Sequence, residues 1–123
     1  MDRQSFEKAA QECFEDLPPF FGERLENVYV VVEDSPSPDL IQRMKLRASS
    51  MLLGLYEGVP INKRGTSYGA YPILPDRITL FRENILRVVD GDKQIREKIR
   101  EVLIHEIGHH FGMSEEEIRR AGY

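Results

Sequence analysis

Two histidines near the C-terminus, His105 and His109, stand four residues apart in the sequence. On an α-helix this spacing places both imidazoles on the same face, one turn apart, so that they can converge on a single zinc ion. Glu106 lies between them in the pattern HExxH, where a carboxylate can take a proton from a water on that zinc. The pattern therefore predicts a metal site with a general base beside it.

The residues that follow offer a third metal ligand. The run continues as HExxHxxGxxE, with Gly112 suited to the left-handed residue that ends a helix and turns the chain back. Glu115, three residues further on, is the expected third ligand, at the spacing that extended zinc motifs use. Glu116 and Glu117 remain alternatives, because Ser114 and Glu117 also form a capping-box pattern at the start of a short last helix.

The third histidine, His110, is not expected to bind the same metal. It lies about 140° round the helix from His105, which makes it a packing or surface residue. A simpler explanation of all three histidines is that such side chains interact well with the last carbonyls and the dipole at a helix C-terminus. Their clustering in one short window, with no histidine elsewhere in the chain, favours the metal site.

Length and composition limit the classes of protein. A chain of 123 residues with 41% hydrophobic and 31% charged residues predicts one soluble globular domain over residues 1–123. The net charge of −4 and a pI near 5.4 argue against nucleic-acid binding. No apolar run reaches membrane-spanning length, and residues 1–5 do not open a signal peptide. We therefore expect a cytoplasmic monomer that binds neither membrane nor nucleic acid.

Hydrophobic periodicity predicts the elements that must position the motif. An amphipathic helix is expected over residues 6–17, from apolar residues at helical spacing: Phe6, Ala9, Ala10, Cys13, Phe14 and Leu17. Residues 27–33 are apolar on both faces and predict an interior strand, and 51–56 and 77–82 predict two more strands. Asp92 is the expected N-cap of the helix that carries the motif.

The glycine- and proline-rich residues 57–76 predict a long loop of the kind that usually serves function. Tyr68 and Tyr71 in this loop are candidates to reach over a cleft and donate to an oxyanion, although packing within the loop is the simpler interpretation. The strand over residues 77–81 is expected to be an exposed edge beside the cleft. An extended peptide could add to such an edge by main-chain hydrogen bonds.

Three stretches, HEIGHHFGMSE, LLGLYEGVPI and LPDRITLFRENI, resemble the minimal zincin family of small bacterial zinc metallopeptidases. The resemblance implies an α+β fold with a sheet of three to four strands packed against a C-terminal active-site helix and an N-terminal amphipathic helix. It also implies zinc at His105 and His109, an acid as third ligand, here Glu115, and Glu106 as general base. Relatives often carry Asp at the third position, and with eight residues given after Glu115 we expect no metzincin Met-turn.

The function that follows is a zinc-dependent metallopeptidase that hydrolyses a peptide substrate bound in extended conformation. One alternative is a non-catalytic zinc-binding or protein-interaction module that retains the site. Another is a zinc-dependent amidase that acts on a non-protein substrate. The fourth coordination position separates the first two, because a structural zinc site is closed by four protein ligands and a catalytic one is left open to water.

Overall fold

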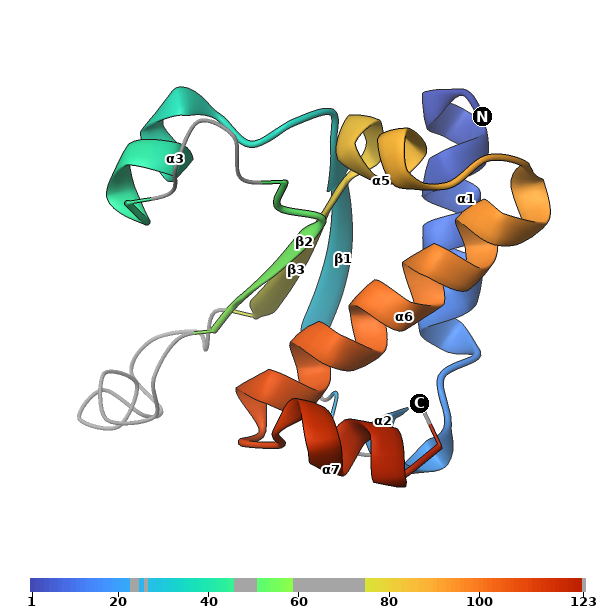
Figure 1. The fold of residues 1–123 in the computed structure, drawn as a ribbon, viewed down its shortest axis with the longest axis vertical. Coiled ribbons are helices and arrows are strands. Elements are labelled where there is room, and N and C mark those ends of the chain that lie inside the picture. Colours follow the sequence, from blue (N-terminus) through green and yellow to red (C-terminus); the bar gives the residue numbers. More distant parts are fainter. Residues whose placement is uncertain (23–24, 26, 46–50, 59–74, 123) are drawn as a thin grey trace.

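The computed structural model describes residues 1–22, 25, 27–45, 51–58 and 75–122. Its elements follow in the order α1 (Arg3–Glu15), α2 (Pro19–Gly22), β1 (Val28–Glu33), α3 (Pro38–Arg43), β2 (Gly54–Glu57), β3 (Asp76–Phe81), α5 (Arg82–Val88), α6 (Asp92–His110) and α7 (Glu115–Arg120) (Figure 1). The fold is α+β, as the sequence predicts. Within the described part of the chain, none of the helices combines the length and apolar character needed to cross a bilayer.

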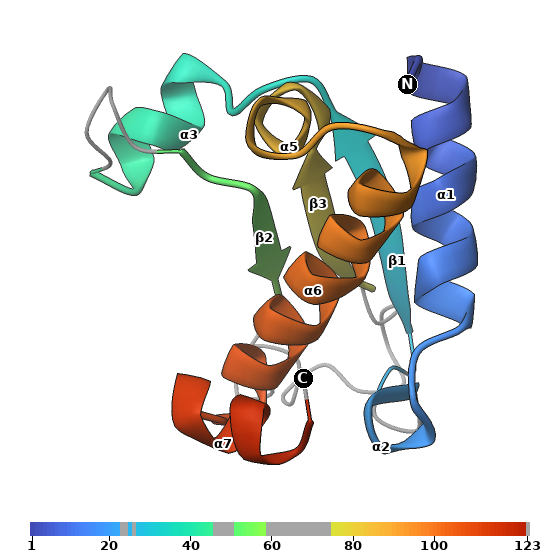
Figure 2. The same cartoon turned by 45° about the vertical axis from the view of Figure 1, so that its right-hand side comes forward.

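The sheet has the strand order β1-β3-β2 among the described residues, as Figure 2 shows. β3 runs parallel to β1, with Val28 opposite Asp76, and antiparallel to β2, with Gly54 opposite Leu80. β3 is therefore the central strand, and two predictions are wrong. In the part of the chain that the structure describes, the strand over residues 27–33 lies at an edge, and the strand over residues 77–81 is paired on both sides.

Both errors have the same physical cause. Apolar side chains on both faces of a strand report what covers the sheet above and below, not how many neighbours the strand has. β1 is apolar on both faces and still pairs, among the described strands, with β3 alone. In β3, Thr79 and Phe81 are buried along with Ile78 and Leu80, so both faces of this central strand are covered.

Helices α1 and α6 lie side by side and cover one face of the sheet (Figures 1 and 2). α1 begins where Asp2 accepts a hydrogen bond from the main-chain nitrogen of Ser5 at 2.8 Å, a normal N-cap. Phe6, Ala9 and Ala10 of its apolar stripe are buried as predicted, whereas Cys13 and Phe14 are half-buried. The core between the sheet and these helices is formed by residues from all of them, including Phe6, Ala9, Ala10, Val32, Ile78, Leu80, Ile99 and Leu103.

α6 crosses the sheet and carries the histidine motif on its last turns. It begins at Asp92, but its N-cap is Gly91, with φ of +87°, and no side chain caps it. The prediction of Asp92 as N-cap is therefore wrong by one residue, because the left-handed conformation needed there suits glycine. The buried face is wide, since the helix packs on the sheet, α1 and α7: it comprises Ile95, Ile99, Val102, Leu103, Ile104, Ile107 and Gly108.

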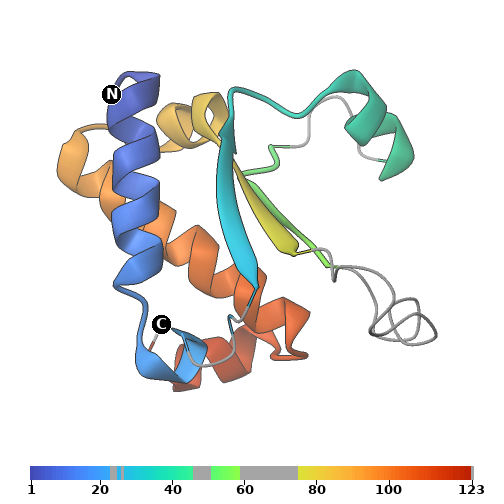
Figure 3. The ribbon, with the colours of Figure 1, turned by 180° about the vertical axis from the view of Figure 1, so that it is seen from behind.

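The opposite side of the sheet carries α3, which lies away from α6 (Figures 1 and 3). β2 begins at Gly54, later than predicted. Before it, the carbonyl of Leu52 accepts a hydrogen bond from the side chain of buried Asn84 at 2.8 Å. Most of the predicted loop over residues 57–76, including Tyr68 and Tyr71, lies outside the described residues.

Candidate metal centre

His105 and His109 project from the last two turns of α6, where the buried face of the helix meets solvent. Their side chains are 22% and 43% exposed. The ring centroids lie 6.2 Å apart and the planes are close to perpendicular, at 82°. The two imidazoles therefore stand one turn apart on one side of the helix, open to solvent on one side.

Glu115, the first residue of α7, brings its carboxylate to both imidazoles. Its Oε2 lies 3.2 Å from Nε2 of His105, and its Oε1 lies 3.0 Å from Nε2 of His109. The chain turns back after α6 through Gly112, whose φ of +84° is the left-handed conformation that the sequence predicts. The turn thus brings together three side chains that the sequence proposed as metal ligands.

The other two acids of α7 have different partners. Glu117 and Ser114 form a capping box, with the Glu117 main-chain nitrogen 3.1 Å from Oγ of Ser114 and the Ser114 nitrogen 3.3 Å from Oε1 of Glu117. Glu116 pairs with Arg120 and its side chain is 72% exposed. Of the three consecutive acids, Glu115 is the one that faces the histidines.

A main-chain contact fixes the tautomer of His105. Its Nδ1 lies 2.8 Å from the carbonyl oxygen of Glu101, and a carbonyl can only accept, so Nδ1 carries the proton. Nε2 of the neutral ring then presents a lone pair to the carboxylate of Glu115. Two acceptors at this distance attract each other only if a proton or a cation lies between them. A carbonyl behind the ring is also the usual support of a metal-binding histidine.

The donors of this triad touch one another directly, and no group of three His, Cys, Asp or Glu side chains in the described residues is disposed to hold a metal ion as it stands. Donor chemistry and spacing nevertheless suit zinc. Ligand atoms on tetrahedral zinc, with bonds of about 2.0–2.1 Å, lie about 3.3–3.4 Å from one another. The present separations of 3.0 and 3.2 Å need to widen by only a few tenths of an ångström, so His105, His109 and Glu115 fit the ion.

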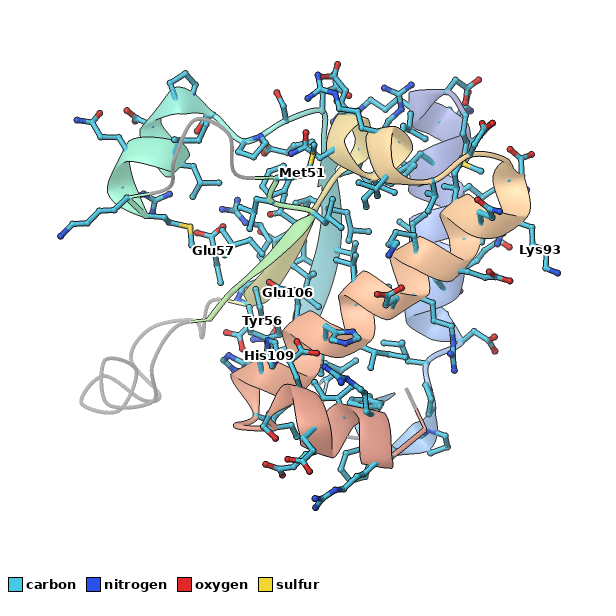
Figure 4. The ribbon with its side chains drawn as sticks, in the orientation of Figure 1. Met51, Tyr56, Glu57, Lys93, Glu106 and His109 are labelled. Carbon is cyan, nitrogen blue, oxygen red and sulfur yellow. The ribbon has the colours of Figure 1, made fainter. Side chains whose placement is uncertain are left out.

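Glu106 lies between α6 and the end of β2, close to Tyr56 and His109 (Figure 4). Burial raises the pKa of its carboxyl above the usual value, while a hydrogen bond from the main chain of Tyr56 and the nearby imidazoles of His109 and His105 lower that pKa in part. The net effect is a raised pKa. A carboxylate held at this position by an edge strand has a fixed orientation, which a proton acceptor requires.

A shallow cleft of about 250 Å³ opens at these residues. It is lined by the polar groups of the motif and by apolar side chains from Leu52 and Leu53, which precede β2, and from Val102 of α6. The hydrogen bond from Asn84 to the Leu52 carbonyl holds Leu52 in place. The cleft therefore offers an apolar surface directly beside the polar groups.

The side chain of His110 contacts Tyr56 and Asp76 instead of the other two histidines. Its ring stacks on Tyr56, and its Nε2 lies 4.0 Å from Oδ2 of Asp76, to which the Tyr56 hydroxyl donates at 2.8 Å. The expectation that His110 does not share the metal agrees with this geometry. The sequence does not predict that the main chain of Tyr56 donates a hydrogen bond to Glu106. Main-chain groups are the same in all residues except proline, so no sequence pattern shows which of them will contact a carboxylate far away in the chain.

Comparison with known proteins supplies the family. Residues 25–123 match the family described as zincin-like metallopeptidase. Among solved structures, the chain is similar to a conserved hypothetical protein from Thermo thermophilus, with a TM-score of 0.56 and 24% identity, covering 89% of this chain and 94% of that one. At this identity the likeness concerns the fold alone. A comparison with curated proteins gives no match.

Proposed function

Because the chain belongs to the zincin-like metallopeptidase family, we propose that it is a zinc-dependent peptidase in which Glu106 is the general base. One observation carries the proposal: the Glu115 carboxylate lies within 3.2 Å of Nε2 of both His105 and His109. Three donors of the types that zinc prefers therefore converge beside a partly buried carboxylate, and one side of the group is open.

His105, His109 and Glu115 would hold the metal, and the carbonyl of Glu101 would keep the His105 ring oriented. Zinc, when bound, supplies a Lewis acid that polarises the scissile carbonyl and makes a neighbouring water more acidic. The apolar side chains of Leu52 and Leu53 limit access of bulk water to the reacting groups.

Glu106 performs the proton transfers. Its carboxylate takes a proton from the attacking water as the hydroxide oxygen bonds to the carbonyl carbon, and passes that proton to the leaving nitrogen as the C–N bond breaks. The carboxylate is unprotonated again at the end of the cycle. The main-chain hydrogen bond from Tyr56 orients it throughout.

The proposed substrate is a peptide in extended conformation, bound along the outer edge of β2. The Phe81 nitrogen donates to the Leu53 carbonyl, so by antiparallel alternation the main-chain groups of Gly54 and Tyr56 face away from β3. The Tyr56 N–H there already donates to Glu106, and Gly54 lines the cleft. Among the described residues β3 is the one strand that pairs with β2. An added strand there would pass directly beside Glu106. This edge replaces the one that the sequence suggested at residues 77–81.

The decisive experiment compares Glu106→Gln with the purified wild type on a peptide library, with and without chelator. Gln keeps the size of the side chain but removes its basicity, so zinc content should stay and cleavage should fall by about 10²–10⁴-fold. Glu97→Gln is the matched control, since it removes an exposed carboxylate from the same helix and should change neither. Full turnover by Glu106→Gln would contradict the proposal, and bound zinc without cleavage in the wild type would favour a zinc-binding module.

A further inference from the structure

Gly108 occupies a buried position on α6 directly before His109. A methyl group added at Gly108 would lie 2.8 Å from Cδ1 and 3.0 Å from Cγ1 of Ile118, which is shorter than side chains tolerate. Ile118 belongs to α7 and is fully buried. α7 is therefore seated so closely on α6 that any side chain at position 108 would force the buried Ile118 side chain to shift.

The same face of α7 carries the third proposed ligand. Ile118 follows Glu115 by three residues, and residues at this spacing share one face of a helix. Ile118 is the buried residue of this six-residue helix, whereas Glu116 and Arg120 are exposed. The depth at which Ile118 sits on Gly108 thus determines how far the Glu115 carboxylate reaches toward the histidines.

The connection between the helices is tied to the same residue. The main-chain nitrogen of Met113 donates to the carbonyl of Gly108 at 2.8 Å, and the sulfur of Met113 would lie 3.7 Å from an added methyl group. Gly108 therefore fixes the turn after α6 by its carbonyl and the position of α7 by its lack of a side chain. Both contacts help to set the position of Glu115 relative to His109.

We propose that Gly108 is a positioning residue for the metal site: its close contact with Ile118 places Glu115 against His105 and His109. The proposal rests on the proposed function, because it takes Glu115 as a ligand. It also makes a prediction opposite to that from helix propensity. Alanine is a better helix former than glycine, so local structure alone favours Gly108→Ala, whereas the contact with Ile118 opposes it.

The test is a double-mutant cycle on zinc affinity, measured by competition with a chromophoric chelator. The four proteins are the wild type, Gly108→Ala, Glu115→Ala and the double variant. Gly108→Ala should weaken zinc binding about tenfold in the wild type, as the loss of a supporting contact does. In the Glu115→Ala background the same change should alter affinity by less than about twofold, since there is no carboxylate left to place.

Two further variants keep the test independent of folding defects. Ile118→Val in the Gly108→Ala background removes the nearest clashing atom and should restore part of the affinity. Ile118→Phe enlarges the same contact from the α7 side with Gly108 intact, and should weaken zinc binding as Gly108→Ala does. Circular dichroism of each protein establishes that its helices are retained.

The outcomes separate this inference from the proposed function. Equal losses from Gly108→Ala in the two backgrounds, or no loss in the wild type, would overturn the positioning role while Glu115→Ala still weakens zinc binding. If Glu115→Ala leaves zinc affinity unchanged, the proposed ligand set itself is wrong and the positioning role is lost with it.

Discussion

The ring of Tyr56 lies against the ring of His110, with centroids 3.8 Å apart and planes 19° from parallel. This stack directs His110 toward Asp76, whereas its chain neighbour His109 faces Glu115. Two consecutive histidines therefore occupy different surroundings, one at the proposed metal site and the other at the junction between α6 and β2. Their substitutions should have separable effects.

Replacement of the histidines by alanine should divide them into two groups. His105→Ala and His109→Ala each remove one of three donors, and we expect both to lose zinc from purified protein, since two remaining donors hold the ion poorly. His110→Ala should retain zinc near the wild-type ratio, because its ring points to Asp76 and Tyr56. Metal analysis after dialysis measures this. Equal zinc content in the three variants would contradict the assignment.

Substitution of Glu115 and substitution of Glu116 should have different effects on zinc affinity. Glu115→Ala should weaken zinc binding by about tenfold or more, whereas Glu116→Ala should leave the affinity nearly unchanged, because Glu116 pairs with Arg120 in solvent. Glu116→Ala is thus the matched control for the loss of one negative charge in the same turn. Zinc titration of both variants decides between them. The reverse order of affinities would place the ligand one residue further along α7.

The stability of the metal-free protein should depend on Glu106 and on pH. Burial raises the folded-state pKa of this carboxyl above its unfolded value, so the fold favours the protonated form. The associated stability is fully present below the unfolded pKa, near 4.3, and is lost as pH rises through the folded pKa. Glu106→Gln stays neutral and can still accept from the Tyr56 main chain. In chelator it should therefore unfold at a higher temperature than the wild type at pH 7.

The control for this prediction is the same pair of proteins at about pH 4, where the wild-type carboxyl is largely protonated and the difference should shrink. Thermal unfolding by circular dichroism at both pH values gives the comparison. A Glu106→Gln variant that is less stable than the wild type at pH 7 would show that the carboxylate makes a favourable contact that outweighs its burial.

The sequence predicted those parts of the site that lie on one element or on a short turn. The positions of His105 and His109 follow from the period of a helix, and the left-handed Gly112 follows from the chemistry of helix ends. The prediction of Glu115 as the third ligand depends on one further assumption, that the last helix, α7, packs back against α6. The structure supplies the missing reason in the contact between Gly108 and Ile118, which no local pattern reveals.

Strand order was the part that sequence reasoning got wrong. The side chains of β1 and β3 report burial on the two faces of the sheet, but the lateral partner of a strand depends on main-chain groups that all residues share. The prediction of residues 77–81 as an edge is therefore wrong, because they form the central strand of the described sheet. The same limitation hid the hydrogen bond from the main chain of Tyr56 to Glu106.

The packing of β2 on α6 leads to the last prediction. A methyl group added at Gly54 would lie 2.5 Å from Cγ1 of Val102 and 3.2 Å from the carbonyl oxygen of Thr79. Gly→Ala at an unhindered site stabilises a protein by about 0.4–1 kcal/mol through the unfolded chain. Here the overpacking should dominate, and Gly54→Ala should lower the free energy of unfolding by about 1–3 kcal/mol in urea denaturation.

Val102→Ala provides the means to attribute that loss to one contact. Val102→Ala alone should destabilise the protein, because Val102 belongs to the core, but in the Gly54→Ala background it should cost less, since it removes the clashing atom. Cleavage should fall in Gly54→Ala more than zinc affinity does, because β2 orients Glu106 through Tyr56 and carries no proposed ligand. If the two single changes instead add without coupling, β2 and α6 are free to move apart, and the edge strand does not fix the base.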